Sequence, residues 1–365
     1  MTRIVLSAIA AWTLALSACS KSSDSGNTES FAQIESDITS DFVFKTALPQ
    51  YTALVNGGNT LDASIQTLNT TTTDANLQIA QTNWRTMRQA WERCEGFLIG
   101  PVEAGDYDPN SDTWPTDYRQ MDSLLTSSNP LNLADVQALP QTLRGYHPIE
   151  YLIFGEGGSR KASDLDARKK KYLTSLSSDL KSIVAALQND WTSAPVNYST
   201  AITKAGTTGN TTYPTKLAFF LDITGDNGMA GICNEVGEQN EDGKIYNPYI
   251  KSDSTLAESP YSGNSLTDFK NNIVGAQQVY LGLNGGKGLK DLVAVKNKDL
   301  DNKIQAAFTS AISSFDNISG PDNMRFEVAI YKRRTAIQQT LTQLNAVQDL
   351  LENDLTTFLK TYVKD

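Results

Sequence analysis

Histidine is almost absent from this sequence: His147 is the only one among 365 residues. The H-E-x-x-H signature of zinc peptidases needs two histidines, and its inverted form, H-x-x-E-H, needs one where Tyr151 stands. A His-rich catalytic zinc site is therefore excluded. The G-x-S-x-G motif of serine hydrolases is also missing, since Gly157-Gly-Ser159 lacks the final glycine. Enzymatic activity stays uncertain, and these absences weigh against it.

Cysteine is scarce too, with three residues in the chain. Cys19 lies next to the hydrophobic N-terminus, which leaves Cys94 and Cys233 for the folded part. Two cysteines and one histidine make a poor zinc site. Cys94 and Cys233 either pair in an oxidising compartment or stay as buried free thiols, and the sequence leaves both alternatives open.

Positive charge is in deficit: 31 lysines and arginines face 41 acidic residues, for a net charge of −10. This balance argues against a nucleic-acid partner, because such partners are held mainly by basic surfaces. Hydrophobic residues make up 39% of the chain and charged residues 20%, which is typical of a globular protein.

Long hydrophobic runs are limited to the N-terminus, where Arg3 precedes the apolar stretch Ile4–Ala18. Residues 1–18 are predicted to be a signal peptide that ends in a lipobox, Leu16-Ser17-Ala18-Cys19. Cys19 would then carry lipid, and residues 19–30 would form a polar tether. The alternative is an ordinary secretory signal with a chance cysteine. We expect a lipid-anchored protein of the bacterial cell envelope, on the periplasmic or surface face of the outer membrane.

Period-2 alternation, the mark of β-strands, is scarce, and helical periodicity dominates. Trp84, Met87, Trp91, Cys94 and Leu98 form one apolar stripe, and residues 172–191 contain another. The longest predicted helix begins after Gly320-Pro321 and runs close to the C-terminus. Only Leu217–Ile223 reads equally well as a strand or a buried helix. The sequence thus predicts an all-α protein.

A segment without periodicity, 192–214, is rich in threonine, glycine, asparagine and proline. It is our predicted domain boundary, which gives an N-terminal helical bundle at 31–200 and a C-terminal bundle at 210–365. Loops are predicted at 102–118, 155–164, 192–214 and 239–264. Similar helix content in the two halves permits an old duplication, although no residue-level repeat is visible.

His147 is the main candidate for chemistry, because on a helix Glu150 at i+3 leaves the same face. Their side chains would offer one cation a nitrogen and a carboxylate oxygen. Pro148 suits a first helical turn, so the alternative is that Glu150 completes a capping arrangement near the helix start.

Two further groups of polar residues are candidates. Arg88 and Glu92, at i and i+4, predict an ion pair at the surface or at an interface. Glu95 borders the apolar stripe, so its carboxylate must be paired, with Arg88, Arg85 or a buried hydroxyl as alternatives, or must bind something. The remaining group is polar and follows Pro260. Within it, Ser265 and Asp268 predict a capping box, whereas Ser262, Asn264 and Ser265 could line a polar pocket.

Several motifs in order resemble the imelysin family. They are Trp84-x3-Arg88-x2-Trp91-Glu92-x2-Glu95-x-Phe97-x2-Gly100-Pro101, then Asp112-Thr-Trp114-Pro115, then Gly145-Tyr-His147-Pro-Ile-Glu150, and then Ser259-Pro-Tyr-Ser262 leading to Asp268-Phe. The third contains the family's G-x-H-x-x-E motif. The resemblance runs from about residue 35 to the C-terminus.

The resemblance implies two all-helical domains, each a modified four-helix bundle, with the motif near their interface. It also implies an envelope protein linked to iron acquisition, in which the H-x-x-E pair is a proposed metal ligand. The family's peptidase label is not transferred to this chain, because it has no second histidine.

The hypothesis that follows is an envelope lipoprotein that binds iron, another divalent cation, or an iron-carrying ligand at the domain interface, as part of iron uptake with envelope partners. The expected metal ligands are His147, Glu150 and Glu95. The expected ligand-binding residues are Arg88, Trp91, Glu92, Ser262 and Asp268. The alternative is a non-catalytic scaffold or peptide-binding protein, and a metal-dependent peptidase ranks behind both.

Overall fold

The computed structural model describes residues 29–364, and every regular element in that range is helical. The predicted signal peptide, Cys19 and nearly all of the tether lie outside the described residues. No helix within 29–364 has the length and apolar character needed to cross a bilayer.

One group of helices contains α2, α3, α8 and α9, and α2 packs along both α3 and α9. The elements up to α10 are α1 Phe31–Asp41, η1 Phe42–Ala47, α2 Leu48–Thr70, α3 Asp74–Cys94, η2 Glu95–Phe97, α4 Pro101–Ala104, α5 Tyr107–Asp112, α6 Tyr118–Thr126, α7 Leu133–Gln137, η3 Gln141–Leu143, α8 Tyr146–Phe154, η4 Glu156–Gly158, η5 Ala162–Asp164, α9 Ala167–Thr192 and α10 Tyr198–Thr203.

A second group contains α12, α14, α16 and α18, each packed against two of the others. The elements from α11 onward are α11 Lys216–Thr224, α12 Met229–Gly237, α13 Tyr246–Lys251, η6 Ser254–Leu256, α14 Ser265–Leu281, α15 Leu289–Lys296, α16 Lys298–Ser319, α17 Phe326–Lys332, α18 Arg334–Asp349, η7 Leu350–Leu355 and α19 Thr356–Tyr362.

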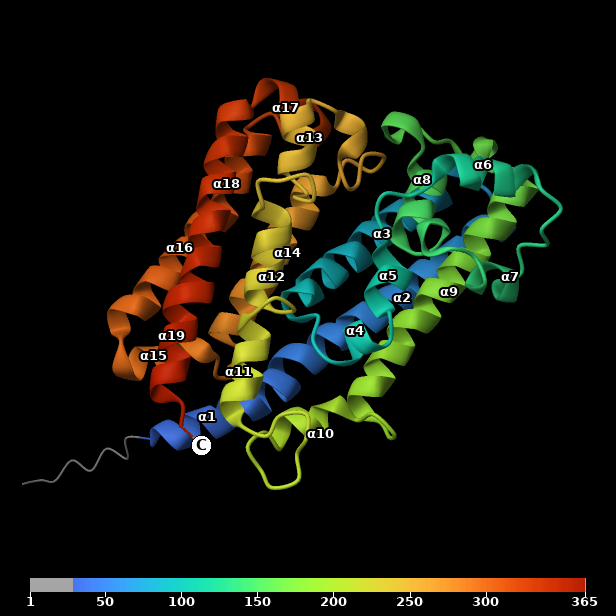
Figure 1. Cartoon of the computed structure of the whole chain (residues 1–365). Helices are drawn as coiled ribbons and strands as arrows, with labels where there is room; N and C mark the ends of the chain where they lie inside the picture. Colours follow the sequence, from blue (N-terminus) through green and yellow to red (C-terminus); the bar gives the residue numbers. More distant parts are fainter. Residues whose placement is uncertain (1–28, 365) are drawn as a thin grey trace, which may run out of the picture.

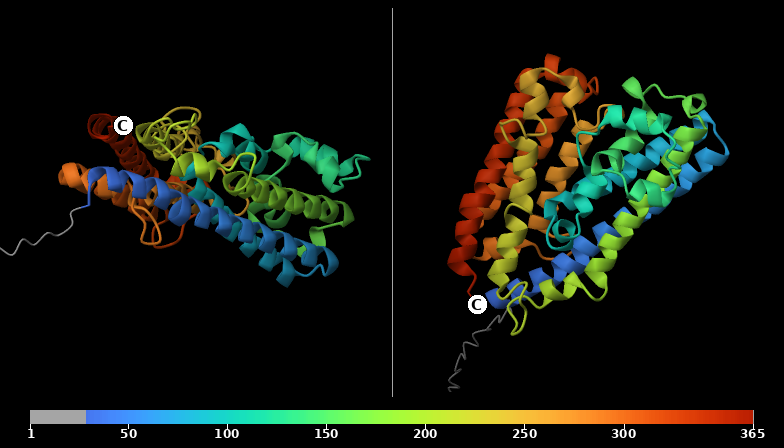
Figure 2. Two further views of the ribbon diagram at one scale, coloured as in Figure 1. Left: turned by 90° about the horizontal axis from the view of Figure 1, so that it is seen from below. Right: turned by 45° about the vertical axis from the view of Figure 1, so that its right-hand side comes forward.

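The two groups form elongated bundles that diverge toward α6 and α17 and come together near α1, α11 and the C-terminus (Figures 1 and 2). Between them, α3 and the short segment η2 pack against α14. Helix α1 precedes the first bundle in sequence but also packs against α15. The N-terminal helix therefore joins the two bundles at their closed end.

Helices α1, η1 and α2 run on without a break from Phe31 to Thr70. The middle piece is a π-helical turn in which the N–H of Leu48 bonds to the carbonyl of Val43. Pro49 follows immediately, and proline has no N–H and crowds the carbonyl four residues earlier. The wider turn accommodates the proline without breaking the helix.

The predicted apolar stripes form the core. Trp84, Met87, Trp91 and Cys94 on α3 are buried. The apolar positions of the predicted C-terminal helix are buried as well: Phe326, Ile330, Ile337, Leu341, Leu344, Leu351, Leu355 and Leu359. Thr73 caps α3 by accepting a bond from the N–H of Asn76, which explains its start. The all-α prediction is confirmed.

Three local predictions need correction. The strand alternative for Leu217–Ile223 is wrong, because α11 covers this run and buries it as a helix. The C-terminal helix starts at Phe326 and is interrupted at Arg333, where φ is −120° and ψ is 31°. The predicted loops contain short helices, among them α5, α10 and α13. Such helices are too short for apolar periodicity to reveal them.

Candidate functional site

His147 lies where α8 begins, fully buried between the bundles. Gly145 precedes the helix with φ of 80°, and a Cβ at this position would lie 1.9 Å from the carbonyl oxygen of Ser111. Glycine is therefore needed to bring the start of α8 against α5. The capping alternative for Glu150 is wrong, since Gly145 is the N-cap and Glu150 bonds to the second bundle.

The imidazole of His147 is held between two carboxylates. Its Nε2 is 3.1 Å from Oδ1 of Asp112, and its Nδ1 is 3.7 Å from Oε2 of Glu150. The ring of Trp114 covers it, with ring centroids 4.9 Å apart. Burial by itself lowers the pKa of His147, but the bonds to Asp112 and Glu150 outweigh burial and raise the pKa to about 9.

Glu150 links the two bundles. Its Oε1 accepts bonds from the backbone N–H and the hydroxyl of Ser262, at 2.8 and 2.7 Å. Arg85 on α3 donates to the carbonyl oxygen of the same serine at 2.8 Å. The loop before α14 is therefore attached to both α3 and α8, and in Figure 1 it projects from the second bundle toward α8.

Arg88 is the central cation of the site and has no exposed surface. Its guanidinium forms ion pairs with Asp112, with Glu92 at 2.5 Å and with Glu258 at 3.2 Å. The predicted pair between Arg88 and Glu92 is present, and it is an interface pair rather than a surface pair. Trp91, which lies on α3 like Arg88, donates its indole N–H to Asp112 at 2.8 Å and so holds this carboxylate in place.

Glu95 lies in η2, just after the end of α3, and its carboxylate faces the second bundle. Asn272 on α14 donates to Glu95 and to Glu92, each at 2.5 Å, and Lys244 lies 3.6 Å from Glu95. The expected pairing of Glu95 with Arg88 or Arg85 is wrong. Its partners come from the other half of the chain, where the spacing within one helix could not indicate them.

The predicted capping box at Ser265 and Asp268 is also wrong. Asn264 is the N-cap of α14, and Ser265 instead accepts a bond from the N–H of Ser259 at 3.0 Å. Asp268 is buried and accepts from the side-chain amide of Asn264 at 2.5 Å. Both residues thus order the loop that carries Ser262 into the site.

Buried acids outnumber buried cations at this interface. We use the name "interface cluster" for six carboxyl groups and three cationic groups: Glu92, Glu95, Asp112, Glu150, Glu258 and Asp268, with Arg88, Lys244 and His147. With every group ionised, the cluster would carry a charge of −3. Burial raises the pKa of Glu92 and Glu95 well above the usual range and that of Asp268 to about 7. Burial also opposes ionisation of Asp112, but Arg88 outweighs it and keeps that pKa low.

Three combinations of these groups place donor atoms close enough to hold one ion. They are Asp112 with His147 and Glu258, Glu92 with Glu95 and Asp112, and Glu92 with Glu258 and Asp268, each with donor atoms within 4.8 Å of one another. Several donor atoms are buried without a hydrogen-bond partner. Among the described residues these atoms include Oε2 of Glu150, Oε2 of Glu258 and Oδ2 of Asp268, whereas Oε1 of Glu92 and the ring of His147 already face Arg88 and Asp112 as ion pairs.

Such a donor set fits a hard metal cation, because it offers carboxylate oxygens and one imidazole. The expected metal ligands fall in different places within it. His147 belongs to the first combination and Glu95 to the second, whereas Glu150 neighbours His147 without completing any of the three. Sequence reasoning missed Glu258, Lys244 and Asn272, which no periodicity marks. Asp112 was visible only as part of the Asp112-Thr-Trp114-Pro115 motif.

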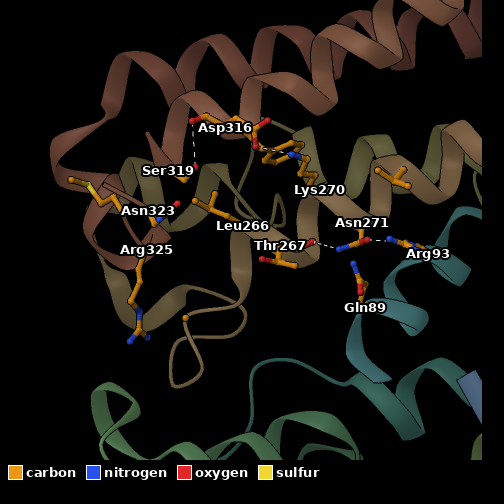
Figure 3. A pocket seen from close by; sticks show the side chains of 14 residues that line it. Gln89, Arg93, Leu266, Thr267, Lys270, Asn271, Asp316, Ser319, Asn323 and Arg325 are labelled. Atoms are coloured by element: carbon orange, nitrogen blue, oxygen red, sulfur yellow. Dashed lines mark hydrogen bonds and ion pairs between the residues drawn. The ribbon is translucent and has the colours of Figure 1, made fainter. Parts of the chain in front are cut away.

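One cavity borders the site, and a second is lined by no residue of the interface cluster. The first, of about 670 Å³, is lined by residues of both bundles, including Trp114, Tyr118 and Tyr261, and lies beside the ring that covers His147. The second, of about 440 Å³, lies between α3, α14 and α16 (Figure 3). Among its polar side chains, Arg93 donates to Asn271 at 2.8 Å and Lys270 pairs with Asp316 at 2.6 Å.

The fold and the site together define an all-helical protein of two bundles with a charged, buried interface. The profile of the Imelysin (Peptidase M75) family matches residues 47–351, and the chain belongs to this family. It is 27% identical over 330 residues to the iron-regulated protein A of Synechococcus elongatus, covering 89% of this chain and 86% of that protein.

Two solved structures share the fold. A putative iron-regulated protein A precursor from Parabacteroides distasonis has a TM-score of 0.75 at 24% identity, covering 90% of this chain and 97% of its own. An imelysin-like protein from Psychrobacter arcticum has a TM-score of 0.70 at 14% identity, covering 92% and 98%.

Proposed function

We propose that this protein binds iron, alone or within a small ligand, at the interface cluster, and that it serves iron uptake as a lipid-anchored protein of the bacterial cell envelope. The observation that carries the proposal is the surplus of buried carboxyl groups over cations, combined with donor atoms that have no hydrogen-bond partner. The name of the relative from Synechococcus elongatus, iron-regulated protein A, supports iron as the metal.

The residues of the interface cluster would have different roles in metal binding. His147, Asp112 and Glu258 offer one nitrogen and two carboxylates on three different segments of the chain. Arg88 holds Asp112 and Glu258 in place from behind, and Trp114 shields the imidazole from water. Bound iron would supply the positive charge that the cluster lacks. Glu150, which the sequence predicted as a metal ligand, would act mainly by joining the loop of Ser262 to α8.

Thermal unfolding with and without iron tests the proposal. A ligand that binds only the folded state at a hundredfold excess over its Kd adds about 2.7 kcal/mol of stability. Ferrous iron under anaerobic conditions should therefore raise the Tm of the wild type. Glu258→Gln keeps the shape of the side chain but removes a charged donor, so it should weaken binding at least tenfold.

Asp316→Asn is the matched control, because Asp316 pairs only with Lys270 on the exposed surface, away from the interface cluster. Iron should raise the Tm of this control variant as much as it raises the Tm of the wild type. The scaffold alternative, favoured by the two bonds from Ser262 to Glu150, expects a lower Tm in Glu150→Gln and no metal response in any variant. The absence of any metal-induced shift in the wild type would end the direct-binding proposal.

A further inference from the structure

Lys244 occupies a carboxylate-lined position at the edge of the interface cluster. Its Nζ lies 2.9 Å from Glu258, 3.0 Å from Glu235 and 3.6 Å from Glu95. An ammonium group surrounded by three carboxylates takes the place of a bound cation. Nothing in the sequence pattern marked this lysine.

Two of these three carboxylates are also metal-donor candidates: Glu258 belongs to two of the three donor combinations and Glu95 to the remaining one. Lys244 faces Oε1 of Glu258, and the other oxygen of that carboxylate, Oε2, has no hydrogen-bond partner among the described residues. A metal ion held by these carboxylates would lie close to the ammonium group, so the two cations would repel each other and compete for the same negative charge.

Arg88 and Lys244 differ in how easily their side chains can move out of the interface cluster. Arg88 is on α3, has no exposed surface and pairs with acids on several sides. Lys244 lies between α12 and α13, outside any helix, and its side chain keeps 15% of its surface exposed. Arg88 therefore has no route to solvent, whereas the side chain of Lys244 does.

The backbone of Lys244 is held in place, so only its side chain has to move. Its N–H bonds to the carbonyl oxygen of Glu235 at 3.0 Å, and the next residue, Ile245, is fully buried. The side chain of Glu235 is 47% exposed. A displaced ammonium can thus remain paired with Glu235 at the surface while it releases Glu95 and Glu258.

We infer that Lys244 is a tethered counter-cation that an incoming metal ion displaces, and that this exchange sets the affinity of the site. The inference rests on the proposed function. A monovalent ion would only replace one unit charge by another and gains little, whereas a divalent or trivalent ion adds net charge to a cluster that lacks it. Lys244 would thereby select for highly charged cations.

Calorimetric titration with ferrous iron under anaerobic conditions tests the exchange in three variants. Lys244→Gln removes the competing charge and should bind at least tenfold more tightly than the wild type. Lys244→Arg keeps the charge and should bind like the wild type. Lys270→Gln removes a lysine that pairs with exposed Asp316 outside the cluster, so it should leave the affinity unchanged.

A second measurement needs no variant and detects the movement itself. Amine acetylation of the wild type, mapped by mass spectrometry, should be slow at Lys244 without metal and several-fold faster with saturating ferrous iron. Lys270 provides the internal reference, since its acetylation rate should not respond to iron.

The outcomes separate the two ideas. If the wild type binds iron but Lys244→Gln binds no more tightly, or if Lys244 acetylation ignores the metal, Lys244 is a structural partner and this inference fails alone. If neither the wild type nor Lys244→Gln binds iron, the proposed function fails and takes this inference with it.

Discussion

Alanine at Gly275 should destabilise the protein by forcing the two bundles apart. Gly275 lies within α14, where this helix crosses the end of α3. A Cβ at Gly275 would lie 2.2 Å from the carbonyl oxygen of Arg93, and one at Gly96 would lie 2.6 Å from the backbone of α14. The two glycines let the backbones of the two bundles approach each other directly.

Two effects of opposite sign compete in Gly275→Ala. Alanine is favoured over glycine inside a helix by about 1 kcal/mol. Overpacking typically costs about 1–3 kcal/mol and sometimes more. Here the new methyl group meets backbone atoms, which no side-chain rotation can relieve, so overpacking is at its upper end. We expect a net loss of about 2 kcal/mol, which lowers the Tm of a protein of this size by about 3 °C.

Thermal unfolding and urea denaturation measure this loss, and Gly58→Ala is the matched control. Gly58 is also inside a long helix, but a Cβ there would first meet Val184 Cγ2 at 3.2 Å and the end of Met87 at 3.3 Å, which are side-chain atoms able to shift. The control should stay within about 1 kcal/mol of the wild type. A Gly275→Ala variant as stable as the wild type would show that the bundles can separate slightly at no cost, contrary to the close approach argued here.

Three further predictions concern buried polar groups and thiols. Arg88→Met should cost about 3–5 kcal/mol in urea denaturation, because it leaves several buried carboxylates without their cation; a loss below about 1 kcal/mol would contradict the central role of Arg88. Asp62→Asn should cost about 1–2 kcal/mol at pH 7, since burial raises the pKa of Asp62 but Lys181 and neighbouring hydroxyls lower it below its usual value. Because the pKa of Asp62 is lower in the folded than in the unfolded state, its carboxylate stabilises the fold above about pH 4, and this stabilisation is lost at lower pH. The difference in unfolding free energy between wild type and variant must therefore shrink as the pH falls through about 4. Cys94 and Cys233 are free and buried, and burial raises the pKa of both thiols, so both should react with a thiol reagent after denaturation without reductant and neither should react in the native state; a disulfide between them would leave both unreactive in each case.

The charged groups of the interface cluster are buried because they balance one another. Six carboxyl groups between two helical bundles would oppose folding unless cations balance them. Arg88 and Lys244 supply part of that balance within the chain. In the metal-free protein the raised pKa values of Glu92 and Glu95 supply the rest, because these carboxyl groups keep their protons, and the proposed iron would replace those protons.

Helical periodicity determined the helices that carry the core. The stripe from Trp84 to Cys94 and the repeats in α9 and α18 are long enough for burial on one face to appear as a 3–4 residue spacing. Pro148, which suits a first helical turn, placed His147 near the start of a helix, and α8 begins at Tyr146. Motif order then indicated the family, and the family profile confirmed it.

Tertiary structure alone decided which residues meet at the interface. Asn272 reaches Glu95, and Lys244 reaches Glu258, from segments whose spacing carries no periodic signal. The capping arrangement predicted for Glu150 failed for the same reason, since its carboxylate bonds to Ser262, which precedes α14 in the second bundle. Asp268, in contrast, bonds to the neighbouring N-cap residue Asn264. A local pattern records which face of a helix is apolar, whereas the pairing of buried charges depends on how two bundles approach, and that distance is fixed by contacts such as Gly96 with Gly275.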